Sequence, residues 1–447
     1  MRTTWLWLTL SSAALALGCC KRDKPSTNPA EPAPSGVGDA AESSELDSPG
    51  SKKTPARCKP IGRDYEVGPG SGNSENLDNM LPFATEVGRG VAYESGYAVG
   101  ALRQAGQSTQ AVVVSTNRDG SAWATVELAT AHGDTEAPTV FASGARLGVA
   151  MLVPAGASRH LRIGRIERGS VQWQAELVQG TDESLAYDVA VGPERMVAVW
   201  DDIPKDRKVS AVCVSTLNPT SFDNPSACRV VTLPGTDADM PRVIVRPGGF
   251  WLLWIARRPQ QTNTRDDNRY LAEEIPHQWL EALPLDQQGG ASGSPLRLTP
   301  RDGHAKLYDV VPGADGSAIV YLRDDDTPSG SSGGELQRIV VGLGAVEGPE
   351  PVGEDGLGEG TPNLTPGWLA IASTQQPTGL GPLGDDGKLL APVATEPSVG
   401  AGVPVASWTS DLLIARPDGM AARLSVLRCK RPDASPPPAD AAPEAAP

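Results

Sequence analysis

The sequence predicts an all-β fold, a β-propeller of seven four-stranded blades. Three observations predict it: a hairpin pattern recurs seven times, its copies are evenly spaced, and the composition favours short strands joined by turns. Hydrophobic residues make up 39% of the 447 residues and aromatic residues 5%, with 49 Gly and 41 Pro. Such a composition suits strands and turns better than layers of helices.

The clearest copy of the hairpin is Pro241–Arg258. Val243 and Val245 alternate with other residues, Pro247–Gly249 form a turn, and Phe250–Ile255 is an apolar run of strand length. The seven copies, in chain order, are Thr85–Leu102, Thr139–Val153, Tyr187–Trp200, Pro241–Arg258, Tyr308–Leu322, Pro362–Ser373 and Val403–Ala415.

The spacing of the copies fits propeller blades. They follow one another at intervals of 44 to 68 residues, close to the ~40–50 residues of a propeller repeat. In the second and third units, two further strand-like runs follow the hairpin: His160–Ile166 with Val171–Leu177, and Val209–Thr216 with Cys228–Leu233. Each unit therefore supplies four strands, and six or eight blades are the alternatives to seven.

The ends of the predicted ring bear on the cysteines. The last unit has a third strand, Arg423–Cys429, but no fourth, and the segment from Cys58 to Val67 has no hairpin before it, so it can supply the missing strand. Antiparallel pairing then makes Cys58 and Cys429 neighbours. Cys213 and Cys228 also fall on the third and fourth strands of one blade. We expect disulfides Cys58–Cys429 and Cys213–Cys228, the alternative being that Cys213 and Cys228 are buried free thiols.

The N-terminus has the pattern of a targeting segment. Arg2 precedes an apolar run from Trp5 to Leu17, and Ala16-Leu17-Gly18-Cys19 resembles the lipobox of bacterial lipoproteins. The resemblance implies cleavage before Cys19 and acylation of that cysteine, which would anchor the protein to a membrane. No Asp follows the anchor, which by the same resemblance favours the outer membrane, at its periplasmic face or its surface. An ordinary secretory signal that contains a cysteine is the alternative.

The remaining domain boundaries follow from composition. Residues 1–18 form the signal peptide, and residues 19–57 are rich in Pro, Ser, Ala and acidic residues, as expected of a disordered tether. The propeller spans 58–430, and 431–447 is a Pro- and Ala-rich tail that we expect to be disordered. The net charge of -15 argues against nucleic acid as a partner, because phosphate recognition needs clustered Lys and Arg.

One local motif resembles a known family. Ser115–Trp123 (STNRDGSAW) is similar to a degenerate Asp box, the turn of sialidase-like propellers, although it is one residue longer and occurs once. In that family the turn is structural, so the resemblance supports the fold and not an activity. A sialidase-type site also needs an Arg-Ile-Pro motif, which is absent. A glycan hydrolase of the cell envelope is therefore the alternative function, and catalytic residues are not assigned.

Metal and cofactor motifs are also absent from the sequence. The four His form no HxH or HExxH pattern, the acidic runs lack the alternate-residue spacing of a Ca²⁺ loop, and no phosphate-binding loop or GxSxG motif occurs. We therefore predict no metal, no cofactor, and a non-catalytic binding or assembly scaffold with a protein or glycan partner in the envelope.

An insertion in the fourth unit is the candidate partner-binding element. The interval after this hairpin is the longest of the six, and the extra length falls largely in 257–288. A loop carrying Tyr270, Trp279 and Arg265 has the composition of a protein-binding hot spot. A short helix over Tyr270–Leu283 is possible within it, and the alternative is a helix that lies against the blade and contributes only burial.

Overall fold

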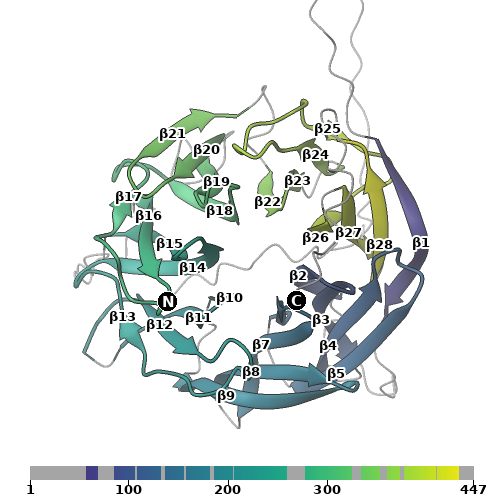
Figure 1. Cartoon of the computed structure of the whole chain (residues 1–447), viewed down its shortest axis with the longest axis horizontal. Helices are drawn as coiled ribbons and strands as arrows, with labels where there is room; N and C mark the ends of the chain where they lie inside the picture. Colours follow the sequence, from purple (N-terminus) through teal and green to yellow (C-terminus); the bar gives the residue numbers. More distant parts are fainter. Residues whose placement is uncertain are drawn as a thin grey trace, which may run out of the picture.

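The computed structural model shows a seven-bladed β-propeller (Figure 1). It describes residues 57–68, 85–105, 108–131, 136–155, 158–181, 186–204, 206–258, 277–324, 334–352, 360–372, 377–408 and 410–431. These residues form 28 strands in seven antiparallel four-stranded sheets, which confirms the predicted fold class and blade count. Among them there is no helix with the length and apolar character that a membrane crossing requires.

The innermost strand of each blade faces the centre of the ring, and consecutive innermost strands contact one another in a closed circle. In circular order they are β2 (Glu86–Tyr93), β6 (Thr139–Ser143), β10 (Tyr187–Val191), β14 (Asp237–Arg246), β18 (Ala305–Pro312), β22 (Thr361–Thr365) and β26 (Val403–Trp408).

The second and third strands of each blade pair outward from it. The second strands are β3 (Gly96–Ala105), β7 (Arg146–Ala155), β11 (Met196–Asp202), β15 (Gly249–Arg257), β19 (Ala318–Asp324), β23 (Trp368–Ala372) and β27 (Asp411–Asp418). The third strands are β4 (Ser108–Asn117), β8 (Ser158–Glu167), β12 (Ala211–Leu217), β16 (Gln278–Asp286), β20 (Glu335–Val341), β24 (Gly379–Pro382) and β28 (Ala421–Cys429).

The fourth strands form the outer rim, and in three blades they are only two residues long. They are β5 (Trp123–Ala131), β9 (Ser170–Thr181), β13 (Arg229–Val230), β17 (Leu296–Arg297), β21 (Val346–Pro351), β25 (Ala394–Thr395) and β1 (Cys58–Val67). Short outer strands leave little unpaired edge for another chain to add to.

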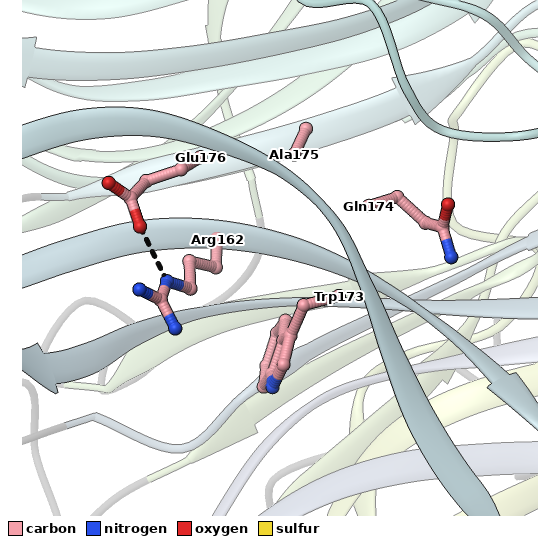
Figure 2. Close-up of a pocket in the computed structure, with 5 residues that line it drawn as sticks. All are labelled: Arg162, Trp173, Gln174, Ala175 and Glu176. Carbon is pink, nitrogen blue, oxygen red and sulfur yellow. Dashed lines mark hydrogen bonds and ion pairs between the residues drawn. The ribbon is translucent and has the colours of Figure 1, made fainter.

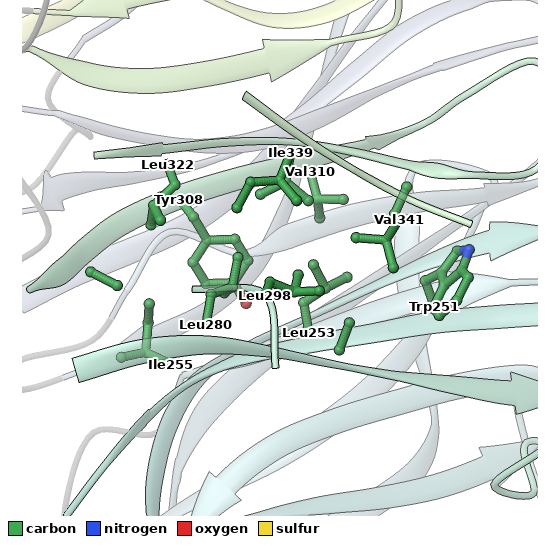
Figure 3. Packing of buried hydrophobic residues seen from close by; sticks show 14 of the residues in the cluster. Trp251, Leu253, Ile255, Leu280, Leu298, Tyr308, Val310, Leu322, Ile339 and Val341 are labelled. Carbon is green, nitrogen blue, oxygen red and sulfur yellow. The ribbon is translucent and has the colours of Figure 1, made fainter. Parts of the chain in front are cut away.

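The core lies between blades, which explains the unbroken apolar runs of the hairpins. In β15, Trp251, Leu253 and Ile255 pack against the following blade (Figure 3). The alternate residues Phe250, Leu252 and Trp254 pack against the preceding blade. Because successive side chains of a strand point to opposite faces, a sheet covered on both faces needs apolar residues at every position.

The ring closes where the two ends of the propeller pair. β1 lies beside β28, with Cys58 opposite Cys429 and Val67 opposite Ala422 (Figure 1, purple beside yellow). A disulfide joins Cys58 to Cys429 and a second joins Cys213 to Cys228, which confirms both predicted pairings, although Cys228 lies one residue before β13 and not within it.

The Asn117–Ser121 turn supports this seam. Asn117 Oδ1 accepts hydrogen bonds from the amides of Ser121 and Ala122, and Trp123 stacks on Tyr65 of β1. Gly62 of β1 has φ +73°, and a Cβ there would lie 2.1 Å from the carbonyl oxygen of Asp119. Glycine at position 62 therefore lets β1 approach the turn.

Candidate functional site

The structure corrects one of the three residues assigned to the insertion. Trp279 belongs to β16, opposite Ala256, and is only 4% exposed, because it packs in the core between the blades of β10 and β14. Its Nε1 donates a hydrogen bond to Glu281. The prediction of a short helix over Tyr270–Leu283 is wrong for its last six residues, because Gln278–Asp286 is a strand. Tyr270, Arg265 and Cys19 lie outside the described residues.

Charged side chains of the innermost strands meet across the centre of the ring. Arg89 of β2 forms an ion pair with Asp309 of β18 and lies 4.0 Å from Asp188 of β10. The ring neighbours of β2 are β6 and β26, so the Arg89 side chain extends past them over the channel to β10 and β18. We call Arg89, Asp188 and Asp309 the channel triad.

Both aspartates of the triad also join neighbouring blades. Asp188 Oδ2 accepts a hydrogen bond from the amide of Val243 on β14, at 3.0 Å. Asp309 Oδ2 accepts one from the amide of Leu364 on β22, at 2.7 Å. Carboxylates held by the backbone of the next blade serve the ring and are poorly placed to exchange protons with a substrate.

The tyrosine that precedes each of these aspartates in the sequence forms a hydrogen bond to the preceding blade. Tyr187 donates its hydroxyl to the carbonyl of Ala150, at 3.1 Å, and Tyr308 donates to the carbonyl of Met240, at 2.7 Å. Burial raises the pKa of both tyrosines, so both remain hydroxyl donors. The sequence signal for this structural role is the Tyr-Asp-Val triplet that begins two of the hairpins.

Desolvation in the channel lowers the pKa of Arg89 to about 10. The positive charge of Arg242, on β14, lowers the pKa further, whereas Asp188 raises it. Arg89 therefore remains charged at neutral pH, and its charge is largely balanced by the two aspartates.

A second cluster lies where the innermost strands begin. Arg257, at the end of β15, donates from Nε to Asp237 and from Nη2 to Asp239, both at 2.6 Å. Asp201, near the end of β11, accepts hydrogen bonds from the amides of Ala186 and Met240. We call Asp201, Asp237, Asp239 and Arg257 the mouth cluster.

Burial raises the pKa of Asp201 to about 8, and the nearby charge of Asp239 raises it as well, although the two backbone amides act in the opposite direction. Asp201 is therefore largely protonated at neutral pH, whereas Asp237 and Asp239 face Arg257. One of the two amides that Asp201 binds belongs to Met240, which has φ +54° in a β-bulge between Asp239 and Arg242. The bulge thus brings both blades to one carboxyl group.

The mouth cluster adjoins the insertion. The described chain leaves the blade one residue after Arg257 and returns at His277. No group of three or more His, Cys, Asp or Glu within the described ranges is arranged to hold a metal ion.

A pocket of about 240 Å³ lies on the outer part of the second blade in chain order, the blade of β6 to β9. It is lined by residues of β8 and β9, namely Arg162, Trp173, Gln174, Ala175 and Glu176 (Figure 2). These residues match no sequence motif, because a single aromatic residue among polar residues is common on outer strands, so the sequence did not indicate the pocket.

Comparisons with known proteins define a class by its fold alone. No protein-family model matches the sequence, and no curated protein sequence matches it significantly. The polysaccharide lyase Uly1 matches with a TM-score of 0.50 and 8% identity, over 83% of this chain and 100% of that chain.

Two further solved structures show weaker likeness. Hydrazine synthase of Kuenenia stuttgartiensis matches with a TM-score of 0.47 and 13% identity, over 80% of this chain and 98% of that chain. An alpha-L-arabinanase of Penicillium chrysogenum, complexed with arabinobiose, matches with a TM-score of 0.42 and 12% identity, over 72% of this chain and 96% of that chain. At these identities the likeness concerns the propeller fold and not the activity.

Proposed function

We propose that the chain is a lipid-anchored binding module of the cell envelope, in which a rigid propeller presents a partner-binding face. Acylation at Cys19 would hold it to a membrane, and residues 19–57 would separate the ring from the lipid surface. The outer membrane is the proposed location, and an envelope protein or glycan is the proposed partner.

The observation that carries this proposal is the way the charged residues of the ring are held. The aspartates of the channel triad accept hydrogen bonds from backbone amides of the next blade. Asp237 and Asp239 form ion pairs with Arg257. Acid–base catalysis needs a carboxyl group that can reach the substrate. A ring whose carboxylates are committed to its own structure is better suited to binding.

The proposed binding face is the one that carries the mouth cluster. The second strands of the blades end there, and the insertion is attached there by Arg258 and His277. Tyr270 and Arg265 would supply the aromatic and guanidinium groups that dominate protein interfaces.

The test replaces residues 260–276 of the full-length, acylated protein with a Gly-Ser linker of equal length. The matched control replaces 326–332, which joins the second and third strands of the neighbouring blade, in the same way. Partners are identified by crosslinking in intact cells, followed by mass spectrometry. We expect the crosslinked partners to be lost for the first variant only, and both variants to have melting temperatures close to that of the wild type. Identical crosslinks in both variants would contradict a role of the insertion in binding.

A polysaccharide-cleaving activity is the second candidate, and Asp201 is the observation that favours it. A buried carboxyl group that keeps its proton near neutral pH, beside carboxylates paired with Arg257, has the separation of protonation states that glycosidases use. Asp201 is only 8% exposed and both of its oxygens accept backbone amides, which favours the binding function. Release of reducing ends from envelope polysaccharides by the wild type, and its loss in Asp201→Asn, would support the enzyme.

A further inference from the structure

The pocket on the outer strands is a site distinct from the mouth cluster. Its lining residues come from β8 and β9, at the rim of the wheel, whereas the mouth cluster lies beside the innermost strands. Its volume of about 240 Å³ is below the ~300–1,000 Å³ of sites for drug-sized ligands. A single ring-sized group would fill it.

A bulge in β9 shapes the pocket. Trp173 lies opposite Gly164 and Ala175 lies opposite Ile163, so Gln174 is the additional residue of the bulged strand. A Cβ at position 164 would lie 2.9 Å from the indole carbon Cε3 of Trp173. Gly164 therefore lets the indole pack this closely on β8, and the bulge turns Gln174 toward the same pocket as Trp173 (Figure 2).

The charges of the pocket are internally balanced. Arg162 Nε donates to Glu176 at 2.7 Å, and His160 Nδ1 lies 3.0 Å from the other oxygen of Glu176. Desolvation raises the pKa of Glu176, but the hydrogen bonds from His160 and Arg162 outweigh it, and the pKa lies below its usual value. Glu176 is thus ionised at neutral pH and matched by Arg162.

The balance of charge and the kinds of lining group select the ligand chemistry. The positive charge of Arg162 repels a cationic ligand, and the negative charge of Glu176 repels an anionic one. The guanidinium of Arg162 supplies donors, the carboxylate of Glu176 supplies acceptors and the amide of Gln174 supplies both, which suits hydroxyl groups. The indole of Trp173 packs in part against the core shared with the preceding blade, and where it lines the pocket it offers an apolar surface on which the C–H groups of a sugar ring can pack.

From these contacts we infer that the pocket binds one neutral sugar residue of a glycan chain. The indole receives the C–H face of the ring, while Arg162, Gln174 and Glu176 bind its hydroxyl groups. Because the pocket is open at the rim, the neighbouring residues of the chain can extend along the outside of the blade.

Calorimetric titration of the full mature chain in detergent with neutral hexasaccharides of glucose, mannose, galactose and N-acetylglucosamine tests this inference. The wild type is expected to bind at least one of them, and Trp173→Ala to weaken that binding at least tenfold. Since Trp173 also packs on the blade, Gln174→Ala is a second variant, expected to weaken binding about threefold or more without a change in melting temperature.

Gln172→Ala is the matched control, because Gln172 is exposed on the same strand outside the pocket. It is expected to bind as the wild type does. The inference is overturned if the wild type binds none of the hexasaccharides at millimolar concentration, or if Gln174→Ala binds as tightly as Gln172→Ala. Neither result depends on residues 260–276, so failure here is separate from failure of the proposed partner-binding face.

Discussion

Removing the bridge between Cys58 and Cys429 is expected to destabilise the ring more than removing the bridge between Cys213 and Cys228. The two bridges join residues separated by 371 and 15 positions in the chain. A cross-link restricts the unfolded chain by an amount that grows with the logarithm of the loop length, which gives about 6 kcal/mol for the long loop and about 3 kcal/mol for the short one.

The assay is equilibrium unfolding in urea of two double variants, Cys58→Ala/Cys429→Ala and Cys213→Ala/Cys228→Ala, each compared with the wild type. Both variants remove two cysteines from the outer half of a blade, and the loops that the two bridges close differ greatly in length. Hydrogen exchange of the β1 amides provides a second measurement, because the bridge also holds β1 against β28.

The expected result is a larger loss of unfolding free energy, and faster exchange in β1, for the variant that lacks Cys58 and Cys429. An equal or smaller loss than in the other variant, with unchanged exchange in β1, would refute the reasoning that this bridge secures the seam.

Two further predictions concern buried side chains. Because burial raises the pKa of Asp201 from 3.8 to about 8, the folded state binds more protons than the unfolded state between these values, and the contribution of Asp201 to stability is lost as pH rises through this window. Melting temperatures from pH 4.5 to 8 should therefore fall less steeply in Asp201→Asn than in the wild type, and parallel curves would contradict the raised pKa. Trp279→Ala should lower the unfolding free energy by ~3–5 kcal/mol, because Trp279 is only 4% exposed and its loss leaves a cavity. A melting temperature within a degree of the wild type would mean that Trp279 is not part of the core.

The ring and its closure could be predicted from the sequence because both depend on local patterns. Alternation and turn residues define each hairpin, and even spacing defines the blade. The same patterns placed Cys429 on the third strand and Cys58 on the fourth strand of one blade, and antiparallel pairing then makes them neighbours.

The insertion shows where a local pattern is insufficient. Trp279 and Leu280 follow a long polar stretch, and a short apolar run fits either a helix or a strand. Only pairing with β15, which places Trp279 opposite Ala256, decides for the strand and buries the indole.

The sequence alone determined the propeller class and favoured seven blades and the two disulfides over their alternatives, since each prediction follows from the order and spacing of strands. The tertiary structure alone decided which polar groups converge. Arg89 and Asp309 are 220 residues apart in the chain, and their pairing depends on the positions of β2 and β18 in the closed ring. The bulges that place Gln174 in the rim pocket and Met240 against Asp201 likewise arise from the pairing of strands, a property of two segments that neither segment encodes by itself.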